Sequence, residues 1–491
     1  MMAHHNETGH KGILRAIARR VMLERGLLPD FQAPELAELN SLRLPAQKSA
    51  PEARDLRGLP WCSIDNTESR DLDQLTYAEP QVGGPFKVLV AVSDVDALVR
   101  KQSALDNHAG HNTCSVYTAA EIFPMLPEKL STDLTSLVFS ADRLAIVVEM
   151  SVAPDGAVTN HDVYTAWVRN KAKLAYSKVA KWLDGELPIL AEIEAIKGLE
   201  ATLRLQDSVA QKMKELRHER GALEFETIHA SPVFEAEILK DLVIDKSDRA
   251  KDIIADFMIA ANAVVATYLS ARNFPSLRRV VRVPKRWDRI VAIASERGYK
   301  LPDEPDSLAL NKFLTAERKA DPDRFPDLSL SVVKLLGSGE YTVETPQGTN
   351  PGHFGLAMKD YTHSTAPNRR FSDLVTQRQV KAALFRLPPP YSGQELEILA
   401  KHCTEAEDTV NKVERQVDKS AAALLLRHRI GETFEGIVTG SAEKGTWVRL
   451  LHLPVEGRVV SGEAGLDVGV KLRVRLLSTD VEAGHIDFAR V

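Results

Sequence analysis

The chain has 491 residues, enough for two to four domains with a sizeable core. Its composition, 44% hydrophobic and 27% charged, is that of an ordinary soluble protein, and a net charge of -5 argues against uniform attraction to nucleic acid. No apolar run approaches the roughly 18 residues of a membrane span, so no membrane partner is expected. Three widely separated cysteines (Cys62, Cys114, Cys403) disfavour a zinc site or a disulfide framework and predict a cytoplasmic location.

Apolar residues recur at i, i+4 and i+8 through residues 12–26, which predicts an amphipathic helix, and a second short helix is expected after it. Residues 1–50 are therefore predicted to form a small N-terminal helical module. Two interpretations stay open. The module is a helix-turn-helix or winged-helix unit with Arg15, Arg19 and Arg20 as a basic face, or it is a simple helical cap on the next domain.

Three aspartates lie within nine residues: Asp65, Asp71 and Asp73. Asp71 and Asp73 are two apart, so on an extended backbone they point to the same face, and Asp65 joins them if the intervening polar residues turn back. Carboxylates that converge repel one another unless protons or a cation neutralise them. Hard oxygen ligands of this kind suit magnesium or manganese. The alternative is an acidic surface loop solvated by water.

A basic run follows a long apolar helix predicted over residues 248–271. Five basic residues lie within residues 277–286, and both an RNA-backbone patch and a solvated basic strand are open interpretations.

Residues 428–491 form a distinct unit of short β-rich runs that alternate with glycine-containing turns. Five short strands in this length predict a small OB-fold barrel. Such barrels often bind single strands through aromatic side chains and a basic groove. The candidates for this role are Phe434, Trp447, Arg449 and Arg458, and for Phe434 a place in the barrel core is an equal alternative.

A second chemically loaded segment contains Arg369 and Arg370, which follow Pro367 and open a predicted helix. Two arginines at a helix N-terminus make a good clamp for phosphate, because their forked donors and the helix dipole both favour an anion. Alone, an Arg-Arg pair is weak evidence.

The aspartate cluster and this arginine segment together resemble the catalytic (RNB) domain of the ribonuclease II family. The family signatures run approximately Ile-Asp-x5-Asp-x-Asp-Asp and Tyr-Thr-His-x-Thr-Ser-Pro-Ile-Arg-Arg-Tyr-x-Asp-Leu. Here they correspond to residues 64–74 and 361–374. Further landmarks of the family are matched, in the same order, by residues 115–117, 124–131, 171–174 and 220–223. Several separated motifs in the right order are far more specific than any one of them.

The resemblance implies an α+β fold, with an RNB catalytic domain over residues 51–427 and a C-terminal OB-fold barrel over 428–491. It also implies processive, magnesium-dependent hydrolysis of single-stranded RNA from 3′ to 5′, which releases nucleoside 5′-monophosphates. We expect a monomer whose partner is single-stranded RNA.

Site residues follow from the resemblance as well. Magnesium, or manganese in its place, would be held by Asp65, Asp71, Asp73 and Gln74, of which Asp73 matches the most critical aspartate. Arg369 matches the arginine that contacts the scissile phosphate, and Arg370 stands beside it. The residues implied in RNA binding are Tyr117 and Phe225 as an aromatic clamp on the terminal bases, Glu414 near the terminal sugar, and Trp447 on the barrel.

Three departures from the family pattern stand out. Gln74 replaces the fourth aspartate, so one anionic ligand is lost although the amide can still donate an oxygen. Ala366 and Asn368 replace the usual Ser and Ile, which we expect to change the turn without removing the arginine clamp. The N-terminal 50 residues cannot hold the two cold-shock barrels that usually precede the catalytic domain.

The main rival hypothesis is a catalytically inactive RNB-fold protein that binds RNA, which the replacement at Gln74 makes conceivable. It predicts tight single-strand binding without mononucleotide release. A metal-dependent DNA exonuclease is a second rival, and matched ribo- and deoxyribo-oligomers separate it from an RNA-degrading enzyme.

Overall fold

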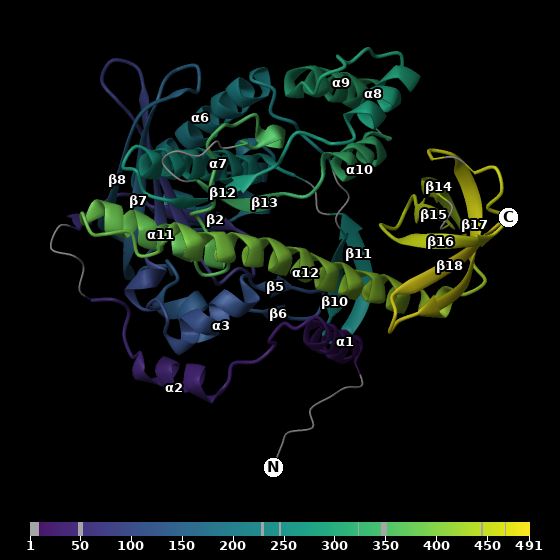
Figure 1. Cartoon of the computed structure of the whole chain (residues 1–491), viewed down its shortest axis with the longest axis horizontal. Helices are drawn as coiled ribbons and strands as arrows, with labels where there is room; N and C mark the ends of the chain where they lie inside the picture. Colours follow the sequence, from purple (N-terminus) through teal and green to yellow (C-terminus); the bar gives the residue numbers. More distant parts are fainter. Residues whose placement is uncertain are drawn as a thin grey trace.

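The computed structural model describes residues 9–47, 53–226, 230–244, 247–322, 324–344, 351–442, 445–466 and 468–491. A mixed sheet, covering helices, a long helix that crosses the molecule and a C-terminal barrel make up the described part (Figure 1). This mixture of helices and strands, with helices at the N-terminal end and a closed barrel at the other, confirms the predicted α+β fold class.

The central sheet has the order β1-β8-β7-β4-β3-β2-β9 within the described residues. Neighbouring strands are antiparallel except β1 with β8 and β2 with β9, which are parallel. The strands of the sheet are β1 (Arg54–Asp55), β2 (Cys62–Asp65), β3 (Gln74–Pro80), β4 (Phe86–Ser93), β7 (Asp142–Val152), β8 (Val158–Arg169) and β9 (Ala172–Ala175).

Both faces of the sheet are buried at β4. Val90 and Val92 pack against α6 (Leu199–Glu219) and α7 (Arg249–Ser270), whereas Leu89 packs on the opposite face with Trp61. The alternation follows from the two-residue period of a strand, and burial on both faces explains why β4 is continuously apolar. By length and composition α7 is the one helix of the described chain that could cross a membrane, yet 67% of its apolar window is buried inside the molecule.

The long helix α12 (Gly393–Leu426) begins at Ser392, whose hydroxyl accepts from the Glu395 N–H while the Glu395 carboxylate accepts from the Ser392 N–H. This capping box fixes the start of the helix. Its apolar residues pack in turn on α11 (Phe371–Leu384) and α3 (Ala104–Asn112) and on α1 (His10–Glu24). Shorter elements around this core are α2 (Ala33–Ser41), α4 (Tyr176–Leu183), α5 (Ala191–Glu194), β5 (Val116–Tyr117), β6 (Ile122–Phe123), β10 (Ala230–Glu235), β11 (Ile238–Ile244), β12 (Ser276–Val280) and β13 (Glu340–Glu344).

The N-terminal helix is a cap on α12. Ile17 and Met22 of α1 are buried against Val413 and Val417 of α12. The three arginines of α1 are paired with carboxylates: Arg15 with Glu121, Arg19 with Asp30, and Arg20 with Glu24 and Glu482. Of the two interpretations of this module, the structure therefore favours the helical cap.

The basic run at residues 277–286 is also largely neutralised. Arg278 is fully buried and paired with Glu344, and Arg279 donates to both carboxylate oxygens of Glu407, at 2.9 and 2.6 Å. Arg282 is paired with Glu340. The run belongs to the joint between β12, β13 and α12, which does not favour the RNA-backbone patch.

A three-helix unit consists of α8 (Trp287–Glu296), α9 (Ser307–Ala320) and α10 (Phe325–Leu336). It has an apolar cluster of its own around Trp287 and Phe313. The Arg449 side chain of the barrel donates to both carboxylate oxygens of Asp327 in α10, at 3.1 and 3.0 Å, with both side chains largely buried. Arg449, a candidate for binding RNA, thus forms an ion pair that joins the barrel to α10.

The C-terminal unit is a closed barrel in the order β14-β15-β16-β18-β17, as predicted. It sits at the end of α12 (Figure 1), and its turn at Gly484 approaches that helix closely. A Cβ at Gly484 would lie 2.8 Å from the Lys419 Cβ, and the φ of +65° also favours glycine. The barrel strands are β14 (Thr433–Ala442), β15 (Gly445–Leu450), β16 (Glu456–Ser461), β17 (Lys471–Asp480) and β18 (His485–Arg490).

Candidate active site

The acidic segment joins β2 to β3. Asp65 is the last residue of β2, and Asp73 comes directly before β3. Leu72 is buried in the core cluster around Trp61, and its N–H and carbonyl are held by the Ser136 hydroxyl and the Leu137 N–H. With Leu72 fixed inward, the neighbours on either side turn to the opposite face, as the two-residue spacing predicts.

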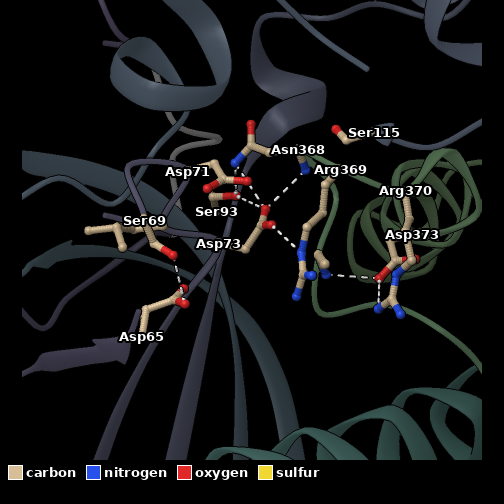
Figure 2. Close-up of polar contacts among 12 residues, drawn as sticks. Asp65, Ser69, Asp71, Asp73, Ser93, Ser115, Asn368, Arg369, Arg370 and Asp373 are labelled. Carbon is tan, nitrogen blue, oxygen red and sulfur yellow. Dashed lines mark hydrogen bonds and ion pairs between the residues drawn. The ribbon is translucent and has the colours of Figure 1, made fainter. Parts of the chain in front are cut away.

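The arginine segment reaches the site just ahead of α11. Arg370 is the N-cap residue of α11, and the Asp373 carboxylate accepts from the Arg370 guanidinium at 2.8 Å and from the Ala366 N–H at 2.8 Å. The Arg369 carbonyl accepts from the Ser115 N–H at 3.0 Å. Figure 2 shows Arg369 turned toward Asp73 and Arg370 turned toward Asp373.

One cavity of about 470 Å³ brings most of the predicted residues together. Residues from α7, among them Met258 and Asn262, also line it, and Asn262 Oδ1 accepts from the Ser364 N–H at 2.9 Å. The predicted site residues that line the cavity are Asp65, Asp71, Asp73, Gln74, Tyr117, Arg369 and Arg370.

Asp73 is the most deeply buried of the three aspartates, with 2% of its surface exposed. Its Oδ1 accepts from the backbone N–H and the side-chain amide of Asn368, both at 2.9 Å, and Arg369 Nε lies 3.5 Å from its Oδ2 (Figure 2). Burial raises the pKa of Asp73 to about 7, against the opposing effects of the Arg369 charge and the Asn368 N–H. Burial also raises the pKa of Asp65, whose carboxylate accepts from Ser69 Oγ at 2.9 Å.

Tyr117 connects two sides of the site. Its hydroxyl donates to Asp71 Oδ2 at 3.1 Å, and its N–H donates to Glu414 Oε1 of α12 at 2.8 Å. The Tyr117 ring is 39% exposed and also lines a second cavity of 490 Å³, whose far wall contains Ile122 and Val243. The two cavities are adjacent, because both are lined by Asn66, Ser69, Asp71 and Tyr117.

Two of the predicted residues lie elsewhere. Phe225 packs against the apolar cluster of the three-helix unit, and Trp447 is on β15 of the barrel, opposite Arg458 of β16. Neither lines the cavities that contain Tyr117.

Asn368 is a site residue that sequence reasoning missed. It was expected only to alter the turn before the arginines, yet its side chain contacts the central aspartate. The available signal was a polar amide at a position where the family pattern has isoleucine.

The donor set fits a divalent cation, although no group of three carboxylate, imidazole or thiol side chains in the described chain is already close enough to form a metal site. Asp73 Oδ2 is buried and accepts no hydrogen bond from any described residue, and it shares the cavity with Asp65, Asp71 and the Gln74 amide. An unsatisfied anionic oxygen among other oxygen donors is what a hard cation requires.

Comparisons with known proteins confirm the resemblance. The RNB domain matches residues 53–386, and the RNase II-type exonuclease C-terminal S1 domain matches residues 432–491. Ribonuclease R of Vibrio cholerae is 32% identical over 419 residues, which is 82% of this chain and 50% of the relative. Ribonuclease R of Escherichia coli is 31% identical over 422 residues, which is 82% of this chain and 51% of the relative. The chain therefore spans about half the length of the curated relatives it matches.

Solved structures share the fold at lower identity. The structure of Mycoplasma genitalium RNase R in complex with ribose methylated single-stranded RNA superposes with a TM-score of 0.88 at 23% identity, covering 99% of this chain and 79% of that one. Yeast Ssd1, described as a pseudonuclease, gives a TM-score of 0.72 at 15% identity, covering 91% of this chain and 55% of that one. With both of its domains matched in order, the chain belongs to the family of RNB-domain proteins with an RNase II-type C-terminal S1 domain.

Proposed function

We propose that this protein is a 3′-to-5′ exoribonuclease that hydrolyses single-stranded RNA processively, with magnesium, to nucleoside 5′-monophosphates. The observation that carries the proposal is the single cavity in which three aspartates face two arginines, with Tyr117 in the lining that this cavity shares with the second one. Ribonucleases with an RNB domain depend in general on a divalent metal, and magnesium is our choice among the hard cations.

Asp65, Asp71, Asp73 and the Gln74 amide would hold the metal. When bound, magnesium supplies an acidified, oriented water and offsets negative charge on the phosphate. The side chains of the protein supply the remaining contacts to the phosphate. Arg369, with 44% of its side chain exposed, is free to turn to the phosphate, while Arg370 is anchored by Asp373. The guanidinium groups stabilise charge as water adds to phosphorus and the 3′ oxygen of the preceding nucleotide leaves.

Tyr117 and Glu414 would orient the RNA end. Stacking on an aromatic ring tolerates any base and is worth about 1–3 kcal/mol, which suits a non-specific processive enzyme. Glu414 is a half-buried carboxylate beside Tyr117, and it is our candidate partner for a ribose 2′-hydroxyl, the group that distinguishes RNA from DNA.

A catalytically inactive RNA-binding protein is the second candidate. Gln74 removes one carboxylate from the cavity, and the same fold occurs in a protein described as a pseudonuclease, so the fold by itself does not decide between the two.

The test is a time course on a 5′-labelled single-stranded RNA of about thirty nucleotides, long enough to reach from a barrel to a buried site. It is run with magnesium, with chelator, and on the matched DNA oligomer. We expect full-length RNA to pass directly to a short labelled end product only with metal. An untouched RNA with a clear binding shift would favour the inactive protein, and equal cleavage of DNA would favour a DNA exonuclease.

A further inference from the structure

Resting on the proposed function, we propose that Asn368 is a positioning residue that decides which oxygen of Asp73 binds the metal. Its side-chain amide holds Asp73 Oδ1 inside the protein and leaves Oδ2 for the cation.

Asp73 Oδ1 is surrounded by donors. The Asn368 N–H and the Asn368 Nδ2–H each lie 2.9 Å from it, and Ser93 Oγ is 3.5 Å away (Figure 2). The same Nδ2 group also lies 3.1 Å from Ser93 Oγ, so its second hydrogen has a partner too. Two strong donors occupy the lone pairs of Oδ1, and a cation is therefore excluded from that side.

The amide cannot turn the other way. Asn368 is fully buried, and its Oδ1 lies 2.6 Å from Thr135 Oγ1. If the amide were flipped, its oxygen would lie against the Asp73 carboxylate, where both groups accept hydrogen bonds and repel each other. The carboxylate therefore selects this orientation, and Thr135 Oγ1, which also lies 2.9 Å from Leu130 O, contacts the amide oxygen.

The other carboxylate oxygen of Asp73, Oδ2, has no such donors. Asp73 Oδ2 is buried and accepts no hydrogen bond from any described residue, and the carboxylate faces the cavity that also holds Asp65 and Asp71. Arg369 Nε lies 3.5 Å from Oδ2 as an ion pair, so a bound cation would take the place of this guanidinium beside the oxygen. With Oδ1 fixed by Asn368, the carboxylate can offer the metal this single oxygen in one orientation.

The backbone N–H of residue 368 would be present with any side chain except proline, so the specific contribution is the amide. The isoleucine of the family pattern could not supply it. This chain also has Gln74 in place of a fourth aspartate, so Asp73 carries a larger share of the attraction for the cation. Precise placement of that one carboxylate therefore matters more here.

The experiment measures Mn²⁺ binding to the full-length protein without RNA, by the electron paramagnetic resonance signal of free Mn²⁺. The variants are Asn368→Ala and Asn368→Leu, the second of which fills the space without donors. Asn112→Ala is the matched control, because Asn112 is also a buried amide, and its hydrogen bonds go to Leu28 and His108 rather than to the site. Thr135→Val acts indirectly, because it removes the hydroxyl that contacts Asn368 Oδ1.

We expect both Asn368 variants to weaken Mn²⁺ binding about tenfold or more, as loss of a group that orients a metal ligand does. Thr135→Val should weaken it less, and Asn112→Ala should not change it. RNA affinity in chelator should stay as in the wild type, and thermal unfolding in chelator identifies variants that fold.

Wild-type Mn²⁺ affinity in both Asn368 variants overturns the inference, and so does an equal loss in Asn112→Ala. If neither Asn368 variant folds, Thr135→Val decides: unchanged Mn²⁺ affinity in that variant overturns the inference. A wild-type protein that binds Mn²⁺ but leaves RNA intact removes the proposed function alone, because metal binding is measured without turnover.

Discussion

Among single residues, Asp73 combines two properties that oppose each other. It is buried, which favours its protonated form, and it is the central candidate for binding a cation, which requires the anion. A buried carboxylate of this kind is costly in the metal-free protein, and the cost is recovered when the cation binds.

Asp73→Asn should abolish hydrolysis and leave RNA affinity within about twofold. The substitution removes one charge but keeps the shape of the side chain, and the proposed RNA contacts are made by other residues. Single-turnover degradation and filter binding in chelator measure the two quantities. Retained turnover in this variant contradicts the site assignment.

The same variant should show a pH-dependent gain in stability. The pKa of Asp73 is raised from 3.8 to about 7 in the folded protein, so its contribution is fully present below about pH 4 and is lost as pH rises through 7. The loss is at most about 4 kcal/mol. In chelator, Asp73→Asn should therefore unfold at a higher temperature than the wild type at pH 8, and the difference should shrink toward pH 5. An equal difference at both pH values contradicts the raised pKa.

Tyr117 allows stacking to be separated from hydrogen bonding. Tyr117→Ala removes the ring and should lengthen the smallest undigested fragment. Tyr117→Phe keeps the ring and removes only the hydroxyl that donates to Asp71, so it should keep the end product and change the metal dependence. Sequencing gels of the end products test both variants. An identical end product in Tyr117→Ala removes Tyr117 from the clamp.

At the level of elements, α1 stabilises the molecule by covering α12. Ile17 is 1% exposed in this interface, so Ile17→Ala should lower the free energy of unfolding by about 2–5 kcal/mol. Leu23 on the same helix is 60% exposed, and Leu23→Ala should change it by no more than about 0.5 kcal/mol. Urea denaturation compares the two. Similar effects of both substitutions would contradict the cap.

The elements and their sequence periods show what could be predicted from the sequence. The alternation of Asp71 and Asp73 about a buried Leu72 and the five-stranded barrel follow from local patterns, and both are present. The role of Asn368 could not be predicted locally, because its partner Asp73 is 295 residues away in the chain. For the same reason the basic run looked free: Arg279 is neutralised by Glu407, 128 residues further on.

For the whole molecule, the barrel contacts α12 at Lys419, and Tyr117 of the site contacts the same helix at Glu414. If RNA runs between the barrel and the site, Trp447→Ala should weaken the binding of long RNA by about 1–3 kcal/mol and leave the binding of the shortest oligomers unchanged. Fluorescence anisotropy over a series of lengths measures this. Equal weakening at every length would place Trp447 outside such a path. The predicted monomer and cytoplasmic location stay predictions.

The packing of α1 on α12 has a consequence for biosynthesis. The helix at residues 10–24 has its main partner at residues 393–426, so much of its apolar face lacks that cover until the later segment has been translated. At about 5–20 residues per second this interval is roughly 20–80 s. During that time the nascent chain exposes an apolar helix face that chaperones can bind. Polypeptides released before α12 has been made should aggregate rather than accumulate as soluble fragments.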